Sequence, residues 1–152
     1  MDNLDHKILE LLEHNGRLTH EEIGKRLNLS RPAIHQRISK LEASGIIKGY
    51  SAEIDWGAAG QGIRAFVFMN VKTTDFNDIM QRVMSIRVDG LKIEKCYRIT
   101  GQWCMMLRIR ASVTDQMTQL HDALLKIEGM LETFTMLILT ESPQREVLNE
   151  EV

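Results

Sequence analysis

The sequence predicts an α+β chain with two parts, a helix-turn-helix followed by a βαββαβ sheet. Up to Leu41, apolar residues recur at the three- and four-residue spacing of helices. From Ile63 onward, short strand-like runs alternate with helical patterns. Between these regions, residues 55–62 are rich in glycine and have no clear period, which is typical of a boundary. We therefore expect two small folding units.

The composition is that of an ordinary globular protein. The chain has 152 residues, of which 43% are hydrophobic and 26% charged, and its formal net charge is −2. So small a charge gives no general attraction to nucleic acid or anionic membrane, so either function would depend on a local patch. The sequence has neither a basic leader nor an apolar run of about 18 residues, so we expect a cytoplasmic protein without membrane contact.

Two helices are expected before residue 28. The first should end at Asn15 and Gly16, which readily enter left-handed conformations. The second should begin at Thr19, because Thr19 and Glu22 have the T-x-x-E spacing of a capping box. The apolar faces of these two helices consist of Leu4, Ile8, Leu11, Leu12, Ile23 and Leu27.

A third helix should follow a short turn, which completes a helix-turn-helix. Ser30 can cap it, Pro32 suits its first turn, and Gly45 can end it. Residues 46–54 are β-branched and interrupted by glycine. They predict either a small wing or a strand that leaves the domain.

The second half predicts a ferredoxin-like sheet with both helices on one face. The expected N-caps of its helices are Asp75 and Thr114. The expected strands are 63–72, 91–99, 103–111 and 131–140, and the expected helices are 76–86 and 114–127. We thus predict a DNA-binding domain over 1–54, a linker over 55–62, a second domain over 63–142 and a tail over 143–152.

Both faces of the predicted sheet are apolar. In the first strand Ala65 and Val67 point one way while Phe66 points the other, and the last strand has the same two-sided character, with Phe134 on one face. Two helices can cover only one face, and large bare apolar patches on soluble proteins mark interfaces. We therefore predict a homodimer formed through this domain.

The third helix has a polar face whose residue types and local charge favour contact with DNA. From Arg17 to Tyr50, seven Lys or Arg stand against three Glu, a local charge of +4. At about 100° per residue, Gln36 lies opposite the apolar Ile34. Its neighbours on this face are Pro32, Ala33, Ser39 and Lys40, and these residue types can contact base edges, thymine methyl groups or phosphates in the major groove.

Other residues of the helix pair are candidates for phosphate contacts that set the register. Arg31 and the backbone N–H groups of Thr19 and His20 could hold phosphates at the helix starts, beside the cap Ser30. His35 could contact a phosphate or a base, although a solvated histidine is an equal alternative.

Two stretches, LDHKILELL near the start and RISKLEASGIIKGYSAEID after the third helix, together with the βαββαβ half, make the chain similar to the Lrp/AsnC family of bacterial and archaeal transcription regulators. The resemblance covers nearly the whole chain. It implies a winged helix-turn-helix that binds double-stranded DNA, and the two-fold symmetry of the predicted dimer implies a roughly palindromic operator. It also implies a second domain that dimerises, with an octamer as a further assembly, and that binds a small effector, often an amino acid.

The resemblance also implies an effector site at the hairpin in ITGQWCMMLRI, formed by Gly101, Gln102, Trp103 and Cys104. Family members commonly have Asp three residues after the glycine, and here Cys104 holds that position. A thiol cannot supply the charge that an amino-acid ammonium group would meet on aspartate. The alternatives are an unusual effector, a nonpolar one, or none.

Other functional classes have little support. No nucleophile with its base, paired carboxylates or phosphate-binding glycine loop is present, so we expect no enzyme, no catalytic residue and no cofactor. The histidines lack metal-ligand spacing, the methionines fit core positions, and Cys96 and Cys104 are expected to be reduced, with a cross-strand disulfide as the minor alternative. A sensing module that controls a partner protein without binding DNA is the alternative function.

Overall fold

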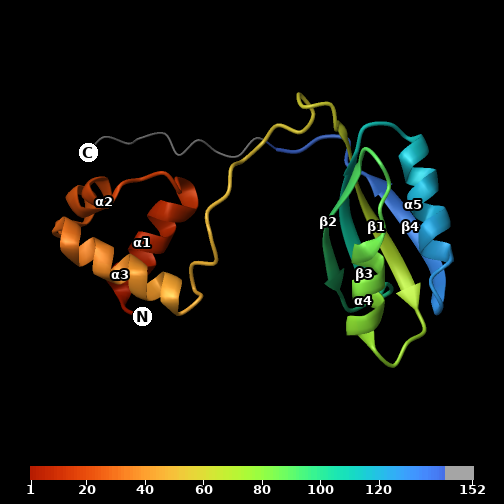
Figure 1. Cartoon of the computed structure of the whole chain (residues 1–152), viewed down its shortest axis with the longest axis horizontal. Coiled ribbons are helices and arrows are strands. Elements are labelled where there is room, and N and C mark those ends of the chain that lie inside the picture. The colour runs from red at the N-terminus through yellow and green to blue at the C-terminus, as the bar shows by residue number, and fades with distance from the viewer. Residues whose placement is uncertain (143–152) are drawn as a thin grey trace. The chain divides into compact units, whose positions relative to one another are not determined.

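The computed structural model describes residues 1–142, which divide into two compact units after Ile54 (Figure 1). The predicted tail, 143–152, lies outside the described residues. The first unit contains α1 (Asn3–His14), α2 (His20–Leu27) and α3 (Arg31–Ala43). None of the helices within residues 1–142 has the length and apolar character that a membrane crossing requires.

Local side-chain caps set the starts of these helices. The capping box of Thr19 and Glu22 is present, as predicted: the Glu22 N–H donates to Thr19 Oγ1 over 3.2 Å, and the Thr19 N–H donates to the Glu22 carboxylate over 2.7 Å. Ser30 Oγ accepts from the Ala33 N–H over 3.3 Å. Asp2 also caps α1 in a reciprocal box, which the sequence interpretation missed.

The turn between α2 and α3 is tight. Asn28 ends α2 in the left-handed conformation, with φ of 54°. A side-chain carbon on Gly24 would lie 2.5 Å from the Leu29 carbonyl oxygen, so only glycine lets the turn pass this close to α2. The core of the unit is formed by five buried residues, Ile8, Ile23, Ile34, Ile38 and Leu41.

The segment after α3 is not a strand. Gly45 follows α3 and adopts the left-handed backbone conformation, with φ of 72°. Residues 46–54 have no strand pairing among the described residues, so the expectation of a strand here is wrong. Instead, Ile47 packs against the helical core and the Tyr50 hydroxyl donates to Glu42 over 2.9 Å. Side-chain contacts, rather than the backbone hydrogen bonds of a sheet, hold this segment in place.

The second unit has the predicted ferredoxin-like order. Its elements are β1 (Ile63–Val71), α4 (Phe76–Ser85), β2 (Leu91–Arg98), β3 (Met105–Ala111), α5 (Asp115–Leu125) and β4 (Met130–Leu137). The antiparallel sheet has the strand order β2-β3-β1-β4. Figure 1 shows α4 and α5 lying along this sheet, and both helices contribute to one core with the buried side chains of β1 and β3.

The opposite face of the sheet carries no helix of the described chain. Ala65, Val67 and Met69 are fully buried under the helices, so Phe66 and Phe68, which alternate with them, face the other way. On β4, Phe134 and Met136 are about half exposed and pair with Phe68 and Phe66. The prediction that α4 and α5 cover one face only is confirmed.

One local expectation in this unit is wrong. Thr114 occupies the N-cap position of α5 but makes no capping hydrogen bond, and instead the Gln116 side chain accepts from the backbone of Ser112 over 2.8 Å. The two cysteines are both free, as expected. Cys96 pairs with Leu107 rather than with Cys104, so the minor alternative of a cross-strand disulfide does not hold.

The segment predicted as a linker is held against the second unit. The guanidinium carbon of Arg110 lies 3.7 Å from the centre of the Trp56 ring. Arg110 Nε donates to Gln61 Oε1 over 2.7 Å, and Gln61 Nε2 donates to the Gly90 carbonyl over 3.0 Å. Residues 55–62 are therefore grouped with the sheet rather than standing apart from it.

Candidate nucleic-acid interface and effector site

The polar face predicted for α3 is accessible. Ile34, Ile38 and Leu41 are buried on one side, whereas Gln36 and Lys40 on the other are exposed. The other candidates on or beside this face are exposed as well, namely Ser30, Arg31, Pro32, His35 and Ser39, while Ala33 is half-buried. This exposure would let a partner reach the whole face without any rearrangement of the helix.

Two hollows divide the candidate DNA-binding residues. Ala33, Gln36 and Lys40 line one, together with Asp5 of α1 and the two residues that precede this helix. Thr19, His20 and Arg31 line the other, at the start of α2. The rings of His20 and His35 connect the two helices, with their centres 5.2 Å apart. Four candidates line neither hollow, namely Ser30, Pro32, His35 and Ser39.

The second hollow also contains Arg17, which was not among the predicted contact residues. Arg17 and Arg31 thus place two guanidinium groups around the start of α2, where backbone N–H groups already favour an anion. The signal in the sequence was the position of Arg17 two residues before the Thr19 cap.

One predicted phosphate donor is already engaged. The Thr19 N–H donates to Glu22 Oε2, so the expectation that it holds a phosphate does not fit this geometry. His20 is the first residue of α2, so its N–H has no acceptor within the helix. The neighbouring hydroxyl of Thr19 also donates to Glu22, over 2.8 Å.

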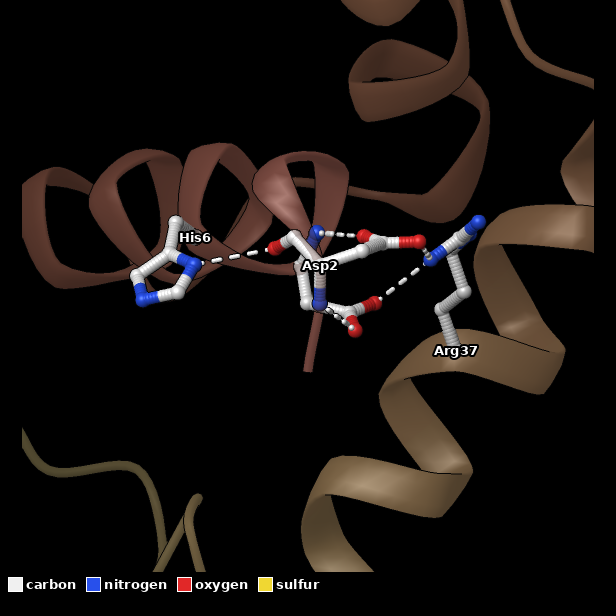
Figure 2. Close-up of polar contacts among 4 residues, drawn as sticks. Asp2, His6 and Arg37 are labelled. Carbon is white, nitrogen blue, oxygen red and sulfur yellow. Dashed lines mark hydrogen bonds and ion pairs between the residues drawn. The ribbon is translucent and has the colours of Figure 1, made fainter.

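Arg37 contributes less to the basic face than the charge count implied. Figure 2 shows its guanidinium group beside the carboxylates at the start of α1. Nη1 donates to Asp2 Oδ2 over 2.8 Å and to Asp5 Oδ1 over 2.7 Å. Met1–Ile54 contains eight Lys or Arg and eight Asp or Glu, so the local +4 has an acidic α1 beside it.

The same contacts shift the titration of both carboxylates. The Asp5 N–H and then the Arg37 guanidinium hold the pKa of Asp2 below its ordinary value, and the Asp2 N–H and Arg37 do the same for Asp5. The lowered pKa values extend to more acidic pH the range in which both carboxylates are ionised and paired with Arg37. The free basic groups near the α3 face are Arg31 and Lys40, among the residues described.

The hairpin between β2 and β3 lies beside an aromatic cluster. Trp103 stacks on Phe134, with ring centres 5.7 Å apart and planes 14° from parallel, and Phe68 lies 6.3 Å from Trp103. Sequence reasoning named Trp103 but not Phe68 and Phe134 as its neighbours. These three rings, which we call the aromatic cluster, occupy the face of the sheet that the helices leave open.

Polar groups border this cluster. Asn70 Nδ2 donates to the Gln102 carbonyl and to Glu132 Oε1, each over 3.1 Å. Gly101 has φ of 113°, a conformation that side-chain-bearing residues rarely adopt. The predicted residues Gly101 to Cys104 are thus brought together in one loop, with Asn70 anchoring it to β1.

The Cys104 thiol is hydrogen-bonded to the backbone of β1. Its Sγ accepts from the Val71 N–H over 3.3 Å and donates to the Met69 carbonyl over 3.4 Å. These bonds lie where the pairing of β1 with β4 shifts register between Asn70 and Val71. An aspartate could accept from Val71 but could not donate to Met69, so cysteine suits this backbone.

Two family models match the chain in succession. Residues 1–48 match one described as a winged helix-turn-helix DNA-binding domain, and residues 64–148 match one described as the Lrp/AsnC ligand binding domain.

Similar proteins cover almost the whole chain. The HTH-type transcriptional regulator FL11 of Pyrococcus furiosus is 31% identical over 91% of this chain and 89% of its own length. The HTH-type transcriptional regulator LrpC of Bacillus subtilis is 32% identical over 93% of both chains.

Solved structures agree with this likeness. The structure of B. subtilis LrpC covers 95% of this chain and 99% of its own, with 31% identity and a TM-score of 0.76. A transcriptional regulator of Neisseria meningitidis in complex with L-Met is 25% identical, covers 97% of this chain and 96% of its own, and has a TM-score of 0.81.

Proposed function

Since this chain belongs to the Lrp/AsnC family of transcription regulators, we propose that it recognises operator DNA through the exposed face of α3. It is a helix-turn-helix regulator with a ligand-binding second domain, and not an enzyme. The observation that carries the proposal is the exposure of Gln36 and Lys40 opposite the buried Ile34.

In this proposal α3 enters the major groove. Gln36 hydrogen-bonds a base edge, where glutamine pairs best with adenine, and Lys40 contacts guanine or phosphate. Ala33 and Pro32 supply apolar contact for a thymine methyl group, with Ser39 as a further polar contact. Arg31, Ser30, His35 and the start of α2 at His20 contact the DNA phosphate backbone, with Arg17 added by the geometry of the hollow.

The test begins with the parent protein and fragments of its host genome, from which bound fragments are selected and sequenced. The enriched sequence gives the operator, on which the parent and the Gln36→Ala, Lys40→Ala double variant are compared by equilibrium titration. We expect the double variant to bind much more weakly. The matched control is Lys126→Ala, which removes an exposed lysine of the second unit. Unchanged operator binding by the double variant would show that α3 does not read the DNA.

We further propose that the protein acts as a homodimer, with an octamer as a further assembly. The support is the open sheet face, where Phe134 and Met136 are 48% and 50% exposed in the single chain. A two-fold dimer calls for a nearly palindromic operator, with half-sites separated by about 10 bp or a multiple of it. A regulator of this kind acts where the chromosome is, which supports a cytoplasmic location.

For the effector we propose an amino acid with an apolar side chain, bound near Gly101, Gln102 and Trp103. The aromatic cluster beside the hairpin supports an apolar ligand, and the structural relative from N. meningitidis was solved with L-Met. Cys104, whose thiol is engaged with β1, leaves the ammonium group without the carboxylate common in the family. The nearby carboxylate of Glu132 is the acidic group that could take its place.

A further inference from the structure

A hollow of about 520 Å³ lies between α4 and the edge strand β2. Three sulfur-bearing side chains line it: Met80 and Met84 from α4, and Cys96 from β2. The remaining lining residues are Asn77, Gln81, Glu94 and Lys95. None of these residues belongs to the candidate DNA interface or to the hairpin 101–104.

The fold places the three sulfur-bearing residues around the same hollow. Met80 and Met84 are four residues apart, so they lie on the same face of α4. Cys96 pairs with Leu107, whose side chain is fully buried, so Cys96 also points toward the helix side of the sheet. All three side chains pack against the same hydrophobic core.

These side chains both pack on the core and border an open space. Met69 and Met105, by contrast, are fully buried in the core. Met80 and Met84 are instead only partly buried and border an open hollow. A methionine thioether on three rotatable bonds can reach an ion placed between them.

The sulfur-containing side chains around this hollow determine which kind of metal ion it would prefer. Thioether and thiolate ligands prefer soft metals such as Cu(I). Among residues 1–142 no group of three His, Cys, Asp or Glu side chains could hold a metal, which argues against a zinc-type centre. The Glu94 carboxylate at the edge of the hollow is engaged by Arg108 and Arg110, over 2.7 and 2.6 Å.

We propose that this hollow binds a soft monovalent metal ion of the Cu(I) type, held by the thioethers of Met80 and Met84 and the sulfur of Cys96. The ion enters already reduced, the Cys96 thiol gives its proton to solvent, and no electron is transferred. The site is made of other residues than the proposed effector site, so either could exist without the other.

The test uses the full chain without oxygen. Cu(I) is titrated in competition with a coloured Cu(I) chelator, and Ag(I), which is redox-inert, is followed by thermal shift. We expect one ion per chain. Losing a residue that only hydrogen-bonds a metal ligand costs about 10- to 100-fold in metal affinity, so losing a ligand itself should cost at least as much. Cys96→Ala and the double variant Met80→Leu, Met84→Leu should therefore each weaken binding at least about tenfold.

Matched controls separate ligation from packing. Met117→Leu changes a methionine of the same core that does not line the hollow, and Cys104→Ala removes the other thiol. Both should retain the ion, and circular dichroism of each variant checks its folding. Leucine conserves the volume of methionine, so the double variant should stay folded.

Three results would overturn the proposal. The parent could fail to compete with the chelator, the Met80→Leu, Met84→Leu variant could bind like the parent, or Cys104→Ala could lose the ion while Cys96→Ala keeps it. A failure of DNA binding in the α3 variants would leave this site untouched, because it shares no residue with α3.

Discussion

Gln36 and Lys40 are both exposed on α3, one turn apart, yet they should affect DNA binding differently. A glutamine amide reads a base edge through two directed hydrogen bonds, so its effect depends on the base. A lysine on a phosphate acts as a point charge, so its effect depends on salt. Comparing the two residues therefore distinguishes sequence-specific recognition of DNA from general electrostatic attraction to it.

Single substitutions should therefore separate the two roles. Gln36→Ala should cost about 1 to 3 kcal/mol at the operator and relax base preference locally. Lys40→Ala should weaken binding to all sequences and reduce the slope of affinity against salt by about 1. Titrations at several salt concentrations, with operator and scrambled DNA, measure both effects. Equal losses on both DNAs for Gln36→Ala would contradict a base contact.

The effector proposal is also decided by single residues. The chain has two tryptophans, Trp56 and Trp103, so Trp103 should be observed alone in a Trp56→Phe background, which keeps an aromatic ring beneath Arg110. We expect apolar amino acids to shift Trp103 emission and raise the melting temperature, while charged ones do neither. Phe134→Leu, which removes the ring stacked on Trp103, should weaken that response. A panel with no responding amino acid would favour a regulator without such an effector.

At the scale of single elements, the two helices of the second unit begin in different ways. Asp75 caps α4, because its Oδ1 accepts from the Asp78 N–H over 3.1 Å. Thr114 occupies the same position of α5 but makes no such bond, since its own φ and ψ are helical rather than extended. The residue type was suitable in both cases, and only the backbone conformation differed.

This difference predicts unequal costs for the same kind of substitution. Asp75→Ala should lower the stability of the second unit by about 1 kcal/mol, the usual cost of a lost cap. Thr114→Ala, the matched control in the same unit, should change stability by less than about 0.5 kcal/mol, as ordinary surface substitutions do. Urea unfolding followed by circular dichroism measures both. Equal losses would mean that Thr114 caps α5 in solution.

At the scale of the whole molecule, the open face of the sheet leaves an apolar surface in the single chain. Phe66 and Phe68 are half-buried there, and Phe134 and Met136 are about half exposed. Trp56, stacked on Arg110, marks where the chain itself covers the sheet. The remaining apolar area over β1 and β4 is the surface that a second copy would bury.

Charges placed on this surface should separate the protomers. Phe66→Asp combined with Phe134→Asp should convert a dimer into a monomer, because two carboxylates would be desolvated at the contact. Sedimentation measures the mass of the particle. The control is Thr118→Asp, on the exposed side of α5, which should leave the assembly unchanged. A parent that sediments as a stable monomer would contradict the dimer.

The sequence by itself determined where α2 and α3 begin and the order of the elements. At Thr19 and Ser30 the capping side chain bonds a backbone group three residues away, so four consecutive residues contain the whole signal. Alternation of apolar residues likewise predicted β1 and its two faces. On α3, the spacing from Ile34 predicted the exposure of Gln36 and Lys40, because helical geometry is regular.

Only the tertiary structure decided which distant groups meet. Arg37 was counted as a free cation until α1 brought the carboxylate of Asp2 to it from 35 residues away. Phe134 stacks on Trp103 because β4 pairs with β1, and Met80 and Cys96 line one hollow because α4 packs on β2. Local patterns carry no information on such pairs, because their distances depend on how whole elements pack against one another.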